Sequence, residues 1–279
     1  MYSATKRFVA NTNCQLDCFD ITEEDLYQFG CEFEFYIDKT HDFKKTISNI
    51  KNEIYKFSNV DILVNLATLP TEVDKNYCIQ IKPDQSLQDS GVEISIPITS
   101  LKGVEHYIKN IFPLIEQYGY TNEDTGLHFH ISTIKKDGVN FDFYVYMLMC
   151  YDKNLLSSWK TRGGYSHNVM DILSGYSKSE TRKIKTKHGT IWNLERVASN
   201  HIEIKSMGGV DYHRQIGKIL SEFHLYADCF DMVYTNREQE YRLKLVDEHK
   251  LLIAKIEPKQ KEEYIKAIYE SGLSETYKI

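Results

Sequence analysis

The chain has 279 residues, a formal charge of −6 at pH 7, and 42% hydrophobic and 13% aromatic residues. These proportions supply a packed core and exclude a low-complexity chain, and the acidic balance does not support general nucleic-acid binding, which usually leaves a basic footprint. The longest apolar run, 143–151, falls short of the roughly 20 residues that span a bilayer. The N-terminus lacks the apolar stretch of a secretory signal. The scattered cysteines lack the paired spacing of a zinc site, so we expect reduced thiols in a cytoplasmic protein.

Strands are predicted where apolar and polar residues alternate, and helices where apolar residues recur at spacings of three and four. After a loosely ordered lead-in over 1–28, the predicted strands of the first half are 31–37, 60–66, 77–81 and 91–96. A helix over 43–54 is predicted because isoleucines recur at 47, 50 and 54. Thr99 or Ser100 is expected to cap a helix over 101–115, and Pro113 to kink that helix or mark its end.

The second half continues with predicted strands at 126–132, 190–194 and 201–205 and predicted helices at 140–159 and 212–230. The charged tail over 235–279 is predicted to be a helical extension. Strands follow one another too often for strict strand–helix alternation. We therefore expect one α+β domain over 1–279, with a largely antiparallel sheet.

Charged side chains share one face of several predicted strands, because residues i and i+2 point the same way. The polar positions are Glu32, Glu34, Glu93, His128, His130, Glu203 and Lys205. The opposite faces are apolar and suited to packing on helices. Carboxylates crowded together repel one another unless a cation lies between them. The pattern therefore predicts an oxygen-rich site with an imidazole, a donor set that suits Mg²⁺ or Mn²⁺ better than Zn²⁺.

Each element of this pattern also has an ordinary explanation. Glu-x-Glu at 32–34 and Glu-x-Lys at 203–205 are common on solvated strand faces, and Asp84-x-Ser86 is a common turn before a strand. His-x-His at 128–130 is more specific, because two imidazoles rarely share a face by accident. Their order along one chain, rather than any single pair, favours a site.

Four short motifs carry a family resemblance. They are Phe-Gly-Cys-Glu-Phe-Glu-Phe at 29–35, Asp-Gln-Ser at 84–86 with Gly-Val-Glu-Ile-Ser at 91–95, Thr-Gly-Leu-His-Phe-His at 125–130, and Arg-Val-Ala-Ser-Asn-His-Ile-Glu-Ile-Lys at 196–205. In this order they resemble the amidoligase branch of the glutamine synthetase-like carboxylate–amine ligases, over about residues 29 to 220. The resemblance implies a curved antiparallel sheet, with the active site on its concave face and helices packed on its convex face.

The family resemblance also implies an activity. Members use ATP to phosphorylate a carboxylate, and an amine then displaces the phosphate to give an amide or isopeptide bond. The nucleotide, the carboxylate and the transition state are all anionic, so divalent cations are needed to neutralise them. The implied cofactors are ATP and Mg²⁺, or Mn²⁺ in its place. The implied partners are small-molecule or peptide carboxylates and amines, whose identity the sequence does not give.

By resemblance, Glu34 and Glu93 are expected to ligate one metal ion, with Asp84 or a water as a further ligand. The expected ligands of a second ion, which bridges the ATP phosphates, are Glu32, His128 and Glu203. His130 and Ser132 are expected beside the nucleotide, and Arg196 to bind the transferring phosphate as a catalytic group.

Three further basic residues enter the predicted site. Lys205, assigned as catalytic, stands where the family often has arginine, so it keeps the charge but loses the planar two-pronged contact to phosphate. Arg162, also assigned as catalytic, lies in a Thr-Arg-Gly-Gly-Tyr loop similar to a family loop that faces the active site. Lys185 belongs to a basic segment, 160–188, which is either a solvated loop or a cover that meets ATP phosphates.

Three alternatives stay open from the sequence. A nucleic-acid-modifying role is not supported by the net charge of −6, but the local basic segment 160–188 leaves it open. The other two concern the metal site. One is a catalytically inactive nucleotide- and metal-binding protein with the same fold. The other is a metal-dependent hydrolase that uses His128, His130 and a carboxylate, which would need Zn²⁺ with an open position for water. The sequence does not indicate an oligomeric state.

Overall fold

The computed structural model describes residues 6–8, 27–65, 75–87, 90–133, 146, 150, 192–193 and 201–235. The described strands are β1 (Lys6–Phe8), β2 (Tyr27–Ile37), β3 (Ile62–Val64), β4 (Ile79–Pro83), β5 (Gly91–Ser95), β6 (Gly119–Tyr120), β7 (Gly126–Thr133), β8 (Trp192–Asn193) and β9 (His201–Gly208). The described helices are α1 (Phe43–Phe57), α2 (Leu101–Tyr118) and α6 (Ile216–Tyr234), with short 3₁₀ helices η1 (Lys75–Tyr77) and η3 (Tyr212–Arg214).

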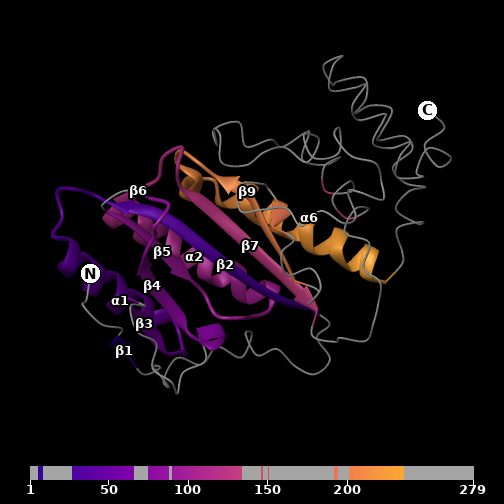
Figure 1. Cartoon of the computed structure of the whole chain (residues 1–279), viewed down its shortest axis with the longest axis horizontal. Helices are drawn as coiled ribbons and strands as arrows, with labels where there is room; N and C mark the ends of the chain where they lie inside the picture. Colours follow the sequence, from indigo (N-terminus) through magenta and orange to yellow (C-terminus); the bar gives the residue numbers. More distant parts are fainter. Residues whose placement is uncertain are drawn as a thin grey trace, which may run out of the picture.

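Within the described residues, the strands form one nine-stranded sheet in the order β1-β3-β4-β5-β2-β7-β9-β8, with β6 paired to β2. Neighbouring strands run antiparallel except β3 and β4, which are parallel. The longest strand, β2, lies near the middle of the sheet, between β5 and β7 (Figure 1). The prediction of a largely antiparallel sheet is therefore confirmed, whereas the specific glutamine synthetase-like fold stays a prediction.

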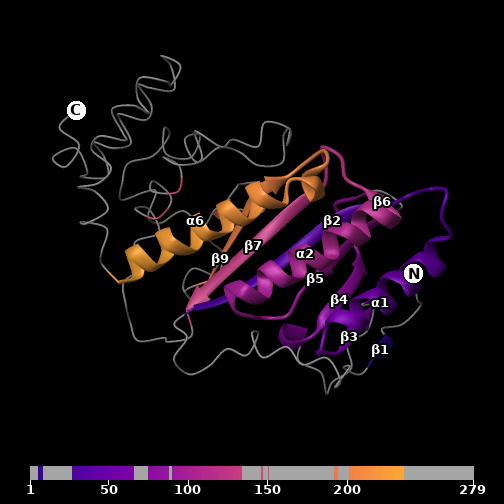
Figure 2. The same cartoon turned by 180° about the vertical axis from the view of Figure 1, so that it is seen from behind.

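The described helices α1, α2 and α6 lie on one side of the sheet. In Figure 1 the strands lie in front of α2 and α6. In Figure 2, the view from behind, α2 and α6 lie in front of the strands. The core between these layers is built from the apolar face of each strand, such as Phe33 and Phe35 on β2, both fully buried. Phe129 of β7 stacks on Phe223 of α6 with ring centroids 4.4 Å apart. The opposite face of the central strands is covered by no described helix.

The helix starts follow the capping residues. Asp42 accepts a hydrogen bond from the backbone N–H of Lys45 at the start of α1, and Ser100 accepts one from Gly103 at the start of α2. Pro113 does not mark the end of α2, which continues to Tyr118. Because Pro113 is exposed, its ring faces solvent. None of the described helices is both long and apolar enough to cross a membrane.

The structure differs from the predicted elements mostly at short segments. The lead-in over 1–28 contains the strand β1, and β2 begins at Tyr27 rather than at 31. The strand predicted at 77–81 is shifted to Ile79–Pro83, after the 3₁₀ turn η1. The predicted helix over 140–159 lies outside the described residues apart from Tyr146 and Cys150, both helical and buried. The basic segment and the tail beyond 235 also lie outside them.

A polar cluster joins the end of α2 to the turn before α6. Glu116 accepts hydrogen bonds from Arg214 Nε at 2.8 Å and Nη2 at 2.9 Å, and lies 2.8 Å from His213 Nε2. His213 Nδ1 lies 3.1 Å from the hydroxyl of Thr121. The hydrogen bonds from Arg214 and His213 lower the pKa of Glu116 to about 2.

This cluster predicts an acid-dependent stability difference. Since the pKa of Glu116 is lowered on folding, its contribution is present above the ordinary glutamate pKa of about 4.5 and is lost as the pH falls toward about 2. Glu116→Gln is therefore expected to lower the melting temperature at pH 7, with the difference shrinking between pH 4.5 and about 2. Thermal melts across this range measure the effect. Glu123→Gln, at an exposed position, is the control and should match the wild type throughout. An unchanged Glu116→Gln difference at low pH would contradict the prediction.

Candidate metal and substrate site

The register of the central strands brings the predicted polar residues together. Glu32 of β2 pairs with His128 of β7 on one side and with Ser95 of β5 on the other. Glu34 pairs with Glu93 of β5 in the same way. Across the next strand pair, His130 lies opposite Glu203 of β9. The shared polar face predicted from alternation is therefore confirmed, and it is the face without a described helix.

His128 lies at the centre of three carboxylates. Its Nδ1 is 3.1 Å from Glu32 Oε2 and 3.3 Å from Glu203 Oε1. Its Nε2 is 3.2 Å from Glu34 Oε1. The His128 side chain is 8% exposed and the Glu34 side chain 5% exposed. Both ring nitrogens thus face carboxylates in a nearly buried cluster.

Within the described residues, one group of side chains has the geometry of a metal site. Glu32, His130 and Glu203 each offer a ligand atom, and these atoms lie within 4.8 Å of one another. His130 Nε2 is 3.4 Å from Glu32 Oε1 and is a buried atom without a well-formed hydrogen bond. Two carboxylates and an imidazole form a donor set that fits a divalent cation such as Mg²⁺ or Mn²⁺.

Electrostatics keep these carboxylates ionised. Burial alone would raise the pKa of Glu32, but the charge of His130 and a hydrogen bond from His128 outweigh it and hold the pKa well below its usual range. The pKa of Glu203 is lowered in the same way, because the charges of His130 and His128 outweigh its burial. For His130, burial is outweighed by the negative charge of Glu32, so its pKa is raised. Glu32 and Glu203 are therefore ionised, and a cation bound at this group would displace the proton from His130, whose ring ligates a metal only in its neutral form.

Glu93 has a different environment from the other carboxylates. Its Oε1 lies 2.9 Å from the ammonium of Lys82, on the neighbouring strand β4, and accepts a hydrogen bond from the hydroxyl of Ser95. Burial, together with the charge of Glu32, raises the pKa of Glu93 to about 7 despite these partners. Sequence reasoning did not assign Lys82, whose position beside Glu93 depends on the pairing of β4 with β5.

On the other side of the cluster, a second lysine is buried. Lys205 is 7% exposed, and its ammonium lies 3.1 Å from Glu203 Oε1. Asn193 of β8 donates a hydrogen bond of 2.6 Å to the other oxygen of Glu203. The predicted position of Lys205 on the polar face is confirmed, while its catalytic role stays a prediction.

Glu34 is held by two hydrogen bonds from distant parts of the chain, one to its side chain and one to its main chain. The N–H of Gly126 donates to Glu34 Oε2 at 2.6 Å, and the hydroxyl of Tyr212 donates to the main-chain oxygen of Glu34 at 2.9 Å. Tyr212 is fully buried. These bonds tie the carboxylate cluster to the start of β7 and to η3.

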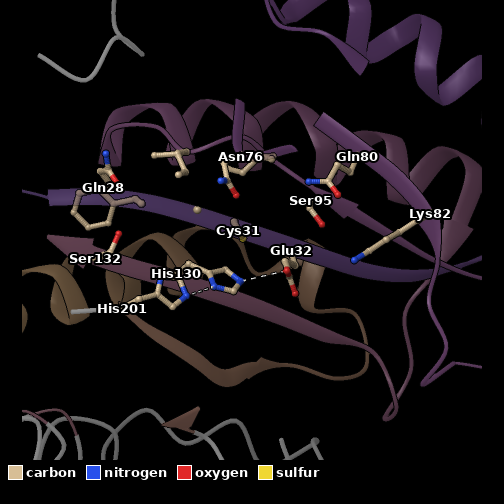
Figure 3. Close-up of a pocket in the computed structure, with 14 residues that line it drawn as sticks. Gln28, Cys31, Glu32, Asn76, Gln80, Lys82, Ser95, His130, Ser132 and His201 are labelled. Atoms are coloured by element: carbon tan, nitrogen blue, oxygen red, sulfur yellow. Dashed lines mark hydrogen bonds and ion pairs between the residues drawn. The ribbon is translucent and has the colours of Figure 1, made fainter. Parts of the chain in front are cut away.

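A pocket of about 380 Å³ opens beside the cluster (Figure 3). It is lined by Gln28, Phe29, Gly30, Cys31, Glu32, Asn76, Gln80, Lys82, Ser95, Ile96, Ile98, His130, Ser132 and His201. Glu32 and Lys82 point toward one another at one end, and His130 lies between Glu32 and His201. His130 Nδ1 is 3.3 Å from His201 Nε2. Such a mixture of charged, amide and apolar groups suits a polar small molecule.

The structure therefore brings most of the predicted site residues together. The residues in the cluster are Glu32, Glu34, Glu93, His128, His130, Glu203 and Lys205, and Ser132 lines the adjoining pocket. Asp84 instead accepts hydrogen bonds from the N–H and hydroxyl of Ser86, which makes it a turn residue. Arg162, Lys185 and Arg196 lie outside the described residues, so their roles stay predictions.

Sequence reasoning missed several pocket residues. His201 and Gln28 alternate with assigned positions on β9 and β2, so period-two spacing could have found them. Asn76 and Gln80 come from η1 and β4, and no spacing pattern relates those segments to the rest of the site.

Comparisons with known proteins identify no family. No protein-family model and no curated protein matches the chain. Among solved structures, a cryo-EM structure of Plasmodium falciparum glutamine synthetase matches with a TM-score of 0.34 and 11% identity. The match covers 74% of this chain and 52% of that chain, so this chain spans about half of its length. A TM-score at this level is too low to establish a shared fold, and the site stands on its own geometry.

Proposed function

We propose that the protein is an ATP- and Mg²⁺-dependent ligase that joins a carboxylate to an amine through an acyl phosphate. The supporting observation is the grouping of Glu32, His130 and Glu203, whose candidate ligand atoms lie within 4.8 Å of one another. It is joined by the ordered motifs that resemble amidoligases. ATP would phosphorylate the carboxylate and leave as ADP, and the amine would then form the amide, release inorganic phosphate and lose a proton.

The chemistry explains why such a site needs a cation. A free carboxylate is a poor electrophile, and converting it to an acyl phosphate installs a leaving group. When bound, a divalent cation would neutralise the negative charge of the phosphates and act as a Lewis acid. In this proposal Glu32, His130 and Glu203 hold the cation, and the pocket beside them positions the anionic substrates.

His128 has a supporting role in this proposal. Because its two ring nitrogens face Glu32, Glu203 and Glu34, it fixes the orientation of the carboxylates. This arrangement favours the ligase over the hydrolase alternative, which would place His128 and His130 on the same zinc ion. In the described part of the chain, the three-ligand group contains His130 and does not contain His128.

The proposal is tested by measuring ADP release with panels of carboxylates and amines, in Mg²⁺ and in Mn²⁺. We expect ADP release that requires both substrates and stops when EDTA removes the metal. Tight ATP binding without amine-dependent ADP release across the panels would favour the inactive binding protein. Zinc retained through purification, with hydrolysis in the absence of ATP, would favour the hydrolase.

A further inference from the structure

The pair Glu34 and Glu93 raises a separate question, because the family resemblance implies that they hold a metal ion of their own. Glu34 already has both oxygens engaged, one by the N–H of Gly126 at 2.6 Å and the other by His128 Nε2 at 3.2 Å. Glu93 has one oxygen engaged by both Lys82 and Ser95. Protein groups therefore already contact three of the four carboxylate oxygens of this pair.

The contact between Lys82 and Glu93 is fixed by the sheet. The two residues are direct partners in the pairing of β4 with β5, so their side chains stand next to each other on the polar face. The Lys82 side chain is 32% exposed and lines the pocket, whereas Glu93 is 9% exposed. Figure 3 shows the ammonium end of Lys82 directed toward Glu32. Lys82 thus presents a positive charge to two carboxylates from a set position.

The described residues supply both acidic and basic groups to the cluster. Four carboxylates belong to it: Glu32, Glu34, Glu93 and Glu203. Two ammonium groups, those of Lys82 and Lys205, contact it. In the described part of the chain, the group Glu32, His130 and Glu203 alone has the spacing of a three-ligand site.

We propose that the site binds one divalent cation, at Glu32, His130 and Glu203, and that Lys82 takes the place of a second ion beside Glu93. The inference rests on the metal-binding part of the proposed function and not on the ligase reaction. It departs from the two-ion arrangement that the family resemblance implies. The Lys82 ammonium is part of the chain and cannot dissociate from the site as a metal ion can. Its positive charge therefore stays beside Glu93.

The test is the number of Mn²⁺ ions bound per chain, measured on the full chain without nucleotide by electron paramagnetic resonance titration. We expect one ion for the wild type and a gain of a second ion in Lys82→Met, because Glu93 and Glu32 then lose their internal cation. Lys82→Arg keeps the charge and is expected to bind one ion. Lys109→Met, which removes an exposed lysine paired with Glu105, is the matched control and should also bind one.

A second variant keeps the test decisive if Lys82→Met does not fold. Glu93→Gln is expected to retain the single ion, because Glu93 is not a ligand of it. Two ions in the wild type, one ion in folded Lys82→Met, or loss of the ion in Glu93→Gln would each overturn the proposal. Wild-type protein that binds no ion would overturn both this inference and the metal-dependent function. One ion without ADP release would support the inference while the ligase function fails.

Discussion

Replacement of Glu203 by glutamine is expected to lower amine-dependent ADP release by about 100-fold or more, since even changes outside the ligand shell commonly cost 10–100-fold. Glu203 is a ligand candidate with Glu32 and His130 and also faces His128 and Lys205. Glutamine keeps the shape but removes the charge on which cation binding depends. In Glu203→Gln, the amide oxygen of the glutamine can accept the hydrogen bond that Asn193 donates to Glu203. The fold is therefore expected to survive.

The control for this variant is Glu53→Gln, which makes the same chemical change on α1, where Glu53 pairs with Lys56. Its ADP release should equal that of the wild type. Circular dichroism and thermal melts verify that both variants are folded. Normal turnover by folded Glu203→Gln, with an unchanged requirement for metal, would show that Glu203 is not a ligand of the functional ion.

Much of the site follows from the alternation of side chains along a strand, which repeats every two residues. That period alone places Glu32 with Glu34 and His128 with His130, and the structure has both pairs on the polar face. What the period does not give is the pairing of one strand with the next. The register between β7 and β9 shifts between Leu127 and Phe129, so the opposition of His130 to Glu203 has no signal in either strand alone.

The roles of the two histidines illustrate the same limit. The family resemblance implies His128 as a metal ligand and His130 as a nucleotide contact. In the structure His128 lies among three carboxylates and His130 completes the three-ligand group. Side chains on one strand face differ in direction by their rotamers and neighbours, which residue spacing does not encode. The contact of Lys82 with Glu93 likewise required the observed pairing of β4 with β5.

At the level of the fold, long periodic elements were predictable and short ones were not. Isoleucines at 47, 50 and 54 indicated α1, and all three are buried. The two-residue strand β6 and the three-residue strand β1 are too short to show a period, and they exist because β2 and β3 offer pairing partners. Tertiary context supplied these elements, as it also allowed α2 to continue past Pro113.

A large stability effect is expected at Gly208, at the end of β9. Its φ of +133° is a conformation that side chains rarely adopt, and an added Cβ would lie 2.6 Å from the backbone oxygen of Thr125 and 2.8 Å from Gly126 Cα. Neither backbone atom can move freely, because the Thr125 oxygen accepts a hydrogen bond from the N–H of Gly209 and Gly126 donates one to Glu34. Gly208→Ala is therefore expected to lower the free energy of unfolding by about 3 kcal/mol, from backbone strain and steric overlap together.

Gly217 provides the matched control for this substitution. It lies in the first turn of α6, and an added Cβ would have no atom within 4 Å. Gly217→Ala is expected to raise the free energy of unfolding by about 0.5 kcal/mol, because alanine restricts the unfolded chain and favours the helix. Urea unfolding of the two variants measures both effects. Because Gly126 connects Gly208 to Glu34, we also expect folded Gly208→Ala to bind Mn²⁺ more weakly than Gly217→Ala. Equal stabilities would mean that the β7–β9 connection yields to a side chain and does not hold the carboxylate cluster in place.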